Sequence, residues 1–293
     1  ALYKGLSNGY SISKGLDIVG NIASLFGPVY GAIGGVINRA FGRKLKDTGI
    51  EGTFSGEDSF AGNTYQFHKG GLLRSDKTKY GALDSTLKTG LGAAYGAVTA
   101  NNKAMADYMG IDSETRLKDF KYKTKFSTHG MSEDKIKEKL TEVLTAAGEA
   151  QAKRLLGTME TVTTTKKTFF GDIKSTSQKW NPSEFVRSGE TALEALTRLS
   201  SSLKVVNTFL DSTNANLLDF STAGADVASK LVDLFGGIDN FSSISSNYYQ
   251  QFFSDQERTA KGHELLSNAF EELGIALPST IAGYRQLVEG QDL

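Results

Sequence analysis

The sequence predicts an α+β fold that is mainly α, with helices around a Gly-rich apolar helical hairpin and a small antiparallel β-meander. Three observations support this prediction. Residues 18–38 contain no charged side chain, residues 48–81 alternate with a period of two between turn signals, and from residue 131 onwards apolar residues recur every three or four positions. We expect the molecule to be elongated and oligomeric.

The first element is the uncharged run Ile18–Asn38, whose 21 residues suffice for a helix to cross a bilayer. Several glycines dilute its hydrophobicity and Pro28 removes a backbone donor, which favours a buried helical hairpin that breaks near Gly27-Pro28, with a membrane-capable segment as the alternative. The residues that would enter a membrane are Ile18, Val19, Leu25, Phe26, Val29, Ile33, Val36 and Ile37. Close helix packing through small residues would use Gly27, Gly31 and Gly35.

Between residues 48 and 81 we expect a small antiparallel meander, which must pack on a helix or on other chains because its apolar residues are few. Residues 83–109 should form a helix, in which Gly90, Gly92 and Gly96 suggest close contact with a neighbouring element. Residues 117–127 alternate between aromatic and mostly lysine side chains. This pattern predicts a strand that could complete the sheet.

The second half of the chain is predicted to be largely helical. Residues 131–156 form the clearest predicted helix. Residues 158–180 are compatible with a strand or with a polar linker. A further helix should run from about residue 183 to 210. The last of these has apolar residues at heptad spacing over about two heptads. It is either the core helix of a bundle or a short oligomeric coiled coil through Leu196, Leu199, Leu203, Val206 and Leu210.

Residues 217–293 should form three or four helices, including 223–235 and one long helix from 238 to 273. An aromatic cluster in this part is a candidate for subunit or partner contact: Tyr248, Tyr249, Phe252 and Phe253. We therefore divide the chain into a linker with the apolar segment (1–47), a small β-rich region with one helix (48–130), long helices with a polar linker (131–216) and a C-terminal helical region (217–293).

Composition excludes several kinds of chemistry. The chain has no cysteine, so disulfides, thiol catalysis and cysteine-based zinc sites are absent. Residues 1–130 carry 17 basic against 11 acidic side chains, an excess too small to predict nucleic-acid binding. The first residue is Ala1, and no signal peptide is recognisable, so we expect a part of a longer polypeptide.

No catalytic constellation is recognisable in the sequence. His68, His129 and His263 stand in unrelated contexts, and the acidic pairs Asp255 with Glu257 and Glu271 with Glu272 resemble solvated helix surfaces. The chain contains no nucleophile elbow, HExxH pair or P-loop. We therefore expect no enzymatic activity, no cofactor and no metal.

Two stretches resemble the C-terminal, tip-proximal part of tape measure proteins from long-tailed bacteriophages. The first is residues 42–78, and the second, stronger one is residues 231–293 with FGGIDNF, YYQQFFSDQER, LGIALP and YRQLVEGQDL. Together they cover about a third of the chain. Unlike a plain ruler, this chain is not one long amphipathic helix, which suits a folded plug at the tail tip better.

The resemblance implies a structural virion protein in the tail lumen and tip. It would assemble as a homotrimer against the tail-tip hub and distal tail proteins, leave the tail ahead of the DNA, and help form a channel through the host envelope and inner membrane. Two rival functions remain open at this point. They are a tail-associated cell-wall hydrolase or peptidase, and a secreted pore-forming effector that uses the same apolar hairpin.

Overall fold

The computed structural model describes residues 44–70, 75–168, 171–181 and 183–272, and its fold is α+β and mainly helical, as predicted. The described residues divide into two compact units. We call residues 44–203 with 219–229 the sheet unit, and residues 204–218 with 230–272 the helical unit. The apolar segment Ile18–Asn38 lies outside the described residues.

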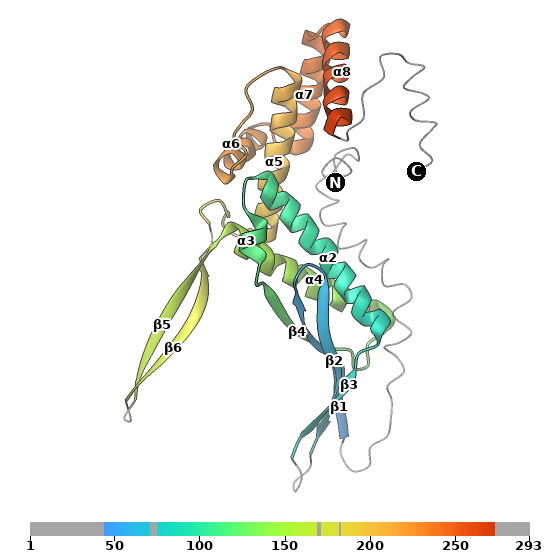
Figure 1. Ribbon diagram of the computed structural model, residues 1–293, viewed down its shortest axis with the longest axis vertical. Coiled ribbons are helices and arrows are strands. Elements are labelled where there is room, and N and C mark those ends of the chain that lie inside the picture. The colour runs from blue at the N-terminus through green and yellow to red at the C-terminus, as the bar shows by residue number, and fades with distance from the viewer. Residues whose placement is uncertain (1–43, 71–74, 169–170, 182, 273–293) are drawn as a thin grey trace. The chain divides into compact units, whose positions relative to one another are not determined.

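The sheet unit contains a four-stranded antiparallel sheet of order β3-β2-β1-β4. Its first three strands form the predicted meander, and the fourth is the predicted lysine-rich strand, which pairs with β1 and completes the sheet (Figure 1). The strands are β1 (Lys44–Ser55), β2 (Ser59–Lys69), β3 (Lys77–Ala82) and β4 (Lys121–Ser127).

One face of this sheet packs against α2 (Ser85–Tyr108) and α4 (Glu133–Leu156), both of which were predicted from their apolar periodicity. Alternate strand residues point into the core, so that Phe54 and Phe60 are buried together with Tyr95 of α2. The Phe54 ring centroid lies 4.9 Å from that of Tyr95. A short helix that was not predicted, α3 (Ser113–Leu117), precedes β4.

The glycines of α2 allow the close contact that the sequence suggested. A Cβ atom at Gly92 would lie 2.2 Å from the Asp58 carbonyl oxygen in the β1–β2 turn, and one at Gly96 would lie 2.9 Å from the Asp58 Cβ. Lys103 of α2 reaches the same turn through an ion pair of 2.8 Å with Glu57. Helix and turn therefore meet backbone to backbone.

A buried polar network joins α2 to α4. The Gln151 amide donates hydrogen bonds to the hydroxyls of Tyr95 (3.0 Å) and Thr99 (2.8 Å). The Asn102 amide nitrogen donates to the Gln151 side-chain oxygen at 3.0 Å and to the Gly148 carbonyl at 3.0 Å. Because these bonds fix both helices in one register, the network specifies how they pack.

Residues 158–181, which the sequence left as strand or linker, form a long β-hairpin. Its strands are β5 (Thr158–Thr168) and β6 (Gly171–Asn181), paired from Thr158 opposite Asn181 to Thr168 opposite Gly171. Among the described strands, these two pair only with each other (Figure 1).

The helix predicted from residue 183 begins later, because α5 spans Ala192–Ser212. Thr191 and Glu194 form a capping box, in which the Glu194 amide donates to the Thr191 hydroxyl (3.2 Å) and the Thr191 amide donates to the Glu194 carboxylate (2.8 Å). Glu149 of α4 accepts hydrogen bonds from the amides of residues 192 and 193, at 3.1 and 2.7 Å. These acceptors satisfy the first amides and fix the start of the helix.

The single helix predicted over 238–273 is two helices, α7 (Ile238–Phe252) and α8 (Asp255–Glu272), which follow α6 (Thr222–Leu234). The break has a local cause, since Ser254 and Glu257 form a second capping box that starts α8. Lys261 of α8 is 8% exposed and forms an ion pair of 3.0 Å with Asp211 of α5. This pair joins two helices within the helical unit.

Candidate interaction surfaces

The most exposed apolar side chains on α7 lie along one side of that helix. Ile244, Tyr248 and Phe252 follow one another at intervals of four residues, a spacing that places side chains on a common face. They are 49%, 45% and 70% exposed. We refer to these three residues as the α7 surface.

Ring contacts hold the α7 surface in shape. Tyr248 stacks on Phe252 with ring centroids 4.8 Å apart, and its edge meets Phe209 of α5 at 6.1 Å. Tyr249 and Phe253 pair with each other at 4.8 Å and are only partly exposed. The aromatic cluster predicted from the sequence is therefore divided, with Tyr248 and Phe252 facing outward and Tyr249 and Phe253 more sheltered.

The α7 helix is almost without charge. After Asp239 in its first turn, no charged residue follows up to Phe252, and the polar positions are serine, asparagine and glutamine. Interfaces between proteins favour aromatic side chains and exclude charge from their centres. The α7 surface thus has the chemistry of a contact with an uncharged protein surface.

The heptad residues of α5 lie in a different environment. Leu196, Leu199, Leu203 and Val206 are fully buried, and Leu210 is partly buried. Burial within one chain is what the bundle-core interpretation of this helix expects.

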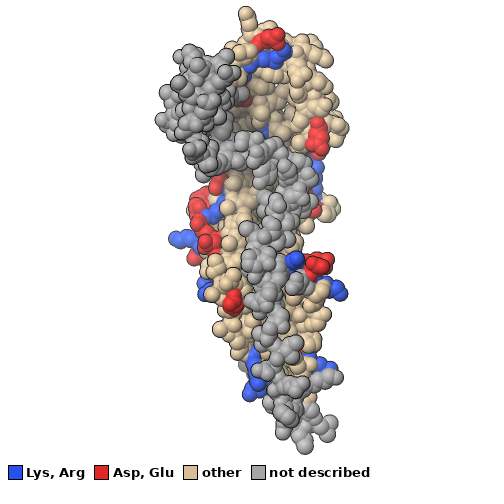
Figure 2. Space-filling model, turned by 90° about the vertical axis from the view of Figure 1, so that its right-hand side faces the viewer, with Lys and Arg blue, Asp and Glu red and all other residues tan. Residues whose placement is uncertain are grey.

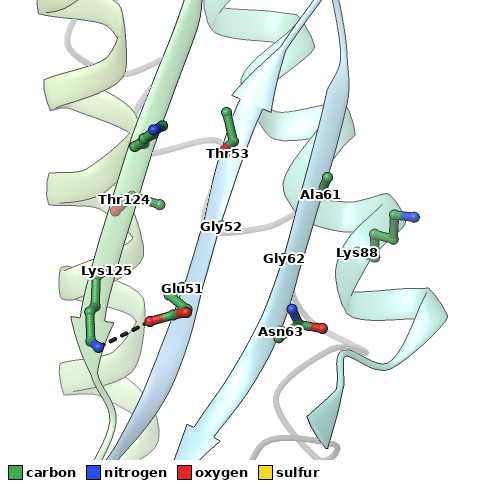
Figure 3. A pocket seen from close by; sticks show the side chains of 10 residues that line it. Glu51, Gly52, Thr53, Ala61, Gly62, Asn63, Lys88, Thr124 and Lys125 are labelled. Atoms are coloured by element: carbon green, nitrogen blue, oxygen red, sulfur yellow. Dashed lines mark ion pairs between the residues drawn. The ribbon is translucent and has the colours of Figure 1, made fainter. Parts of the chain in front are cut away.

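A second candidate surface is the face of the sheet that points away from α2 and α4. A shallow concave region runs across its central strands, lined by the small residues Thr53, Ala61 and Asn63 and by Lys123 (Figure 3). Glu51 and Lys125 form an ion pair of 3.0 Å across β1 and β4 at its border. The region is wide and open, a form that suits another protein surface better than an enclosed small molecule.

Beside this region lies a polar network on the same face. Asp47 accepts hydrogen bonds from the hydroxyls of Tyr65 at 2.7 Å and Ser127 at 2.5 Å. Burial acts to raise the pKa of Asp47, but the hydrogen bonds from Ser127, Tyr65 and the Thr48 backbone outweigh it and lower that pKa. Burial and the bond to Asp47 raise the pKa of Tyr65. The hydroxyls of Tyr65 and Ser127 thus both donate to one carboxylate, which lies between β2 and β4.

The histidines and the first acidic pair considered in the sequence analysis lie in separate places. His129 and His263 are exposed, whereas His68 is buried with neither ring nitrogen bonded among the described residues. Asp255 pairs with Arg258, and Glu257 caps α8. The described part of the chain contains no group of three or more His, Asp or Glu side chains placed to hold a metal ion.

Charge and hydropathy add two observations about the described residues. On the face drawn in Figure 2, basic and acidic side chains lie interspersed and form no large area of one sign. None of the described helices combines the length and hydropathy needed to span a bilayer. The predicted membrane-insertion residues and the packing glycines all lie outside the described ranges.

No protein-family model, curated protein or solved structure matches this chain.

Proposed function

We propose that this chain is a structural protein of a bacteriophage tail, the C-terminal part of a tape measure protein. In this proposal it plugs the distal tail tip as a homotrimer against hub and distal tail proteins. On infection it is released and helps form a channel for DNA across the host envelope. The virion tail and, during infection, the host envelope would be its locations.

The α7 surface is the observation that carries this proposal. Tyr248 and Phe252 belong to the motif YYQQFFSDQER, on which the resemblance chiefly depends. A large aromatic ring that is 70% exposed, on a helix without charge after its first turn, is costly in water and favours burial against a partner. The motif therefore coincides with an exposed aromatic surface, which supports a role in contact with a partner.

The other motif in this part of the chain supplies the local geometry. In FGGIDNF, Gly236 and Gly237 have φ angles of +80° and +112°, which side chains other than glycine rarely adopt. They turn the chain between α6 and α7, and the rings of Phe235 and Phe241 meet edge to face at 5.3 Å. The motif residues thus fix where α7 begins.

The release step concerns the apolar segment Ile18–Asn38. In the assembled tail the segment would be covered, and loss of contacts at the tip would shift the population towards a membrane-inserted state. Partition of the isolated segment into liposomes with a gain of helix is the expected result. Absence of both would remove this step and leave the structural role in place.

The test of the assembly role uses two matched variants of α7 in the phage that encodes the chain. Phe252→Asp places a charge in the α7 surface, and Ser246→Asp places the same charge at an exposed position on the other side of the helix. We expect Phe252→Asp to reduce incorporation into purified tails and Ser246→Asp to leave it unchanged. Equal incorporation of both variants, or absence of the wild-type chain from particles, would contradict the proposal.

A further inference from the structure

The two sheets of this chain have very different edges. The outer strands of the four-stranded sheet are β3 and β4. They carry lysine at alternate positions, namely Lys77 and Lys79 on β3, and Lys121, Lys123 and Lys125 on β4. Lysines on an outer strand discourage pairing with a strand from another molecule. The four-stranded sheet is thus protected at both edges.

The β5–β6 hairpin lacks this protection along its middle. Residues 161–165 of β5 and 175–178 of β6 contain no charge, proline or glycine. Threonine and valine, which fill residues 161–165, favour extended strands. Each strand is 11 residues long, and each has one side without a partner among the described strands. Both edges can therefore accept a further strand.

An isolated ribbon of two strands is at best marginally stable in water. Thr163, at the centre of β5, is exposed. The hairpin would gain backbone hydrogen bonds on both sides from further pairing. Its length and its unprotected edges thus favour a paired state.

We propose that β5 pairs in antiparallel fashion with β6 of a neighbouring copy of this chain, so that the hairpins close into a ring. The charges at the two ends of each strand fit this arrangement. Within the chain, Glu160 is in register with Lys179 and Lys167 with Asp172. When hairpins stand side by side in the same direction, with the stagger of two residues that ring closure brings, the same opposite charges lie diagonally across the contact between copies, a spacing that long side chains can bridge.

A closed ring also explains why both edges are unprotected. Pairing of β5 with β5 of a second copy about a two-fold axis would leave both β6 edges open, whereas a head-to-tail contact uses one edge of each strand. Closure removes all free edges. The inference rests on the self-association in the proposed function and identifies the segment that carries it.

Disulfide trapping tests the pairing, because the chain has no cysteine of its own. One preparation carries Thr163→Cys, and a second, differently tagged preparation carries Lys174→Cys, Thr176→Cys or Gln178→Cys. Thr176 is the register partner of Thr163 within the chain, and all three positions lie on the same face of the ribbon as Thr163. Together they test pairing without a shift and pairing shifted by two residues in either direction, which includes the stagger that ring closure requires. After mixing and mild oxidation we expect a disulfide between the two tags for one of them. Ser246→Cys, on α7, is the control for random collision.

A second pair of variants avoids the use of cysteine. Thr163→Lys gives β5 the same protection that β4 has, and Thr163→Val keeps an uncharged strand former at the same position. We expect the lysine variant to lose the oligomeric mass that the wild type and the valine variant show in light scattering.

The outcomes separate this inference from the proposed function. An oligomer without the β5–β6 disulfide, or a disulfide between two Thr163→Cys chains alone, would overturn the ring and leave the tail role standing. A chain that is monomeric at all concentrations would overturn the ring as well. Incorporation into tails, measured with the α7 variants, does not depend on either result.

Discussion

The Tyr65 hydroxyl donates a hydrogen bond of 2.7 Å to Asp47, a residue 18 positions earlier on the neighbouring strand. The Ser127 hydroxyl from β4 donates to the other carboxylate oxygen at 2.5 Å. One carboxylate thus joins three strands of the sheet. Lys125 lies over the Tyr65 ring at 4.3 Å and shields it further.

The first prediction concerns acid stability. Hydrogen bonds lower the pKa of Asp47 in spite of its burial, so the folded chain binds fewer protons than the unfolded chain near pH 4. The stabilisation is complete at neutral pH and is lost as the pH falls through the folded pKa. Asp47→Asn should cost about 1–2 kcal/mol at pH 7 and weaken the acid dependence. Urea unfolding over a pH series measures both, with the exposed Asp119→Asn as control.

A second prediction concerns glycines in helices. Ala at position 92 would bring its Cβ to 2.2 Å from the Asp58 carbonyl oxygen, whereas a Cβ at Gly262 of α8 meets no atom within 4 Å. Gly92→Ala should therefore destabilise the chain by about 1–3 kcal/mol through overpacking. Gly262→Ala should stabilise it by roughly 0.5–1 kcal/mol through helix propensity. Thermal unfolding of both variants checks the opposite signs, and a stabilised Gly92→Ala variant would refute the close contact.

The third prediction concerns Gln151 in the buried network. Gln151→Leu removes the donor to Tyr95 and Thr99 and the acceptor for Asn102. Buried groups left without partners each cost about 1–3 kcal/mol. Thr99 still donates to the Tyr95 carbonyl and Asn102 to the Gly148 carbonyl, so the Tyr95 hydroxyl is the group that loses its partner. We expect a loss of about 1–3 kcal/mol in the free energy of unfolding. Glu138→Leu, an exposed position on the same helix, should change stability far less.

The fourth prediction concerns the helical unit. Asp211, at 3.0 Å, is the main cause of the raised pKa of Lys261, with Glu264 at 3.2 Å contributing. Asp211→Asn should therefore expose α8 amides to faster hydrogen exchange than Glu264→Gln does. Because the pKa of Lys261 is raised in the folded chain, its ion pairs stabilise the fold fully at a pH below the pKa of a lysine in the unfolded chain, about 10. This stabilisation is lost as the pH rises through the folded pKa. Exchange rates that are equal in the two variants would argue against this pairing.

Much of the fold followed from local patterns. The meander and the two long helices of the sheet unit matched their predicted ranges closely, because each has a clear period of two or of three to four. The predicted strand 117–127 is present as β4 but begins at Lys121, because Leu117 ends helix α3. The late start of α5 and the break before α8 were also present in the sequence, as the capping boxes Thr191 to Glu194 and Ser254 to Glu257. The helix expected from about residue 183 therefore begins at Ala192.

Other features could not be read from one-dimensional patterns. The sequence of the β5–β6 hairpin consists mostly of threonine, serine and lysine, so no clear alternation of apolar and polar residues marks it as strand. The partners Asp47 and Ser127 are 80 residues apart and meet only in the folded sheet. The four aromatic residues of the α7 cluster could be predicted from the sequence as contact candidates. Which of their rings face outward is seen only in the folded chain, where Tyr248 packs against Phe209.

The most direct test of the proposed role is the mass and position of the chain in assembled particles. Light scattering of the purified chain should give a trimer, and imaging of tails with a label on the helical unit should place density on the axis at the distal tip. A monomer in solution that is absent from purified particles would contradict the proposal and favour a secreted effector or an enzyme.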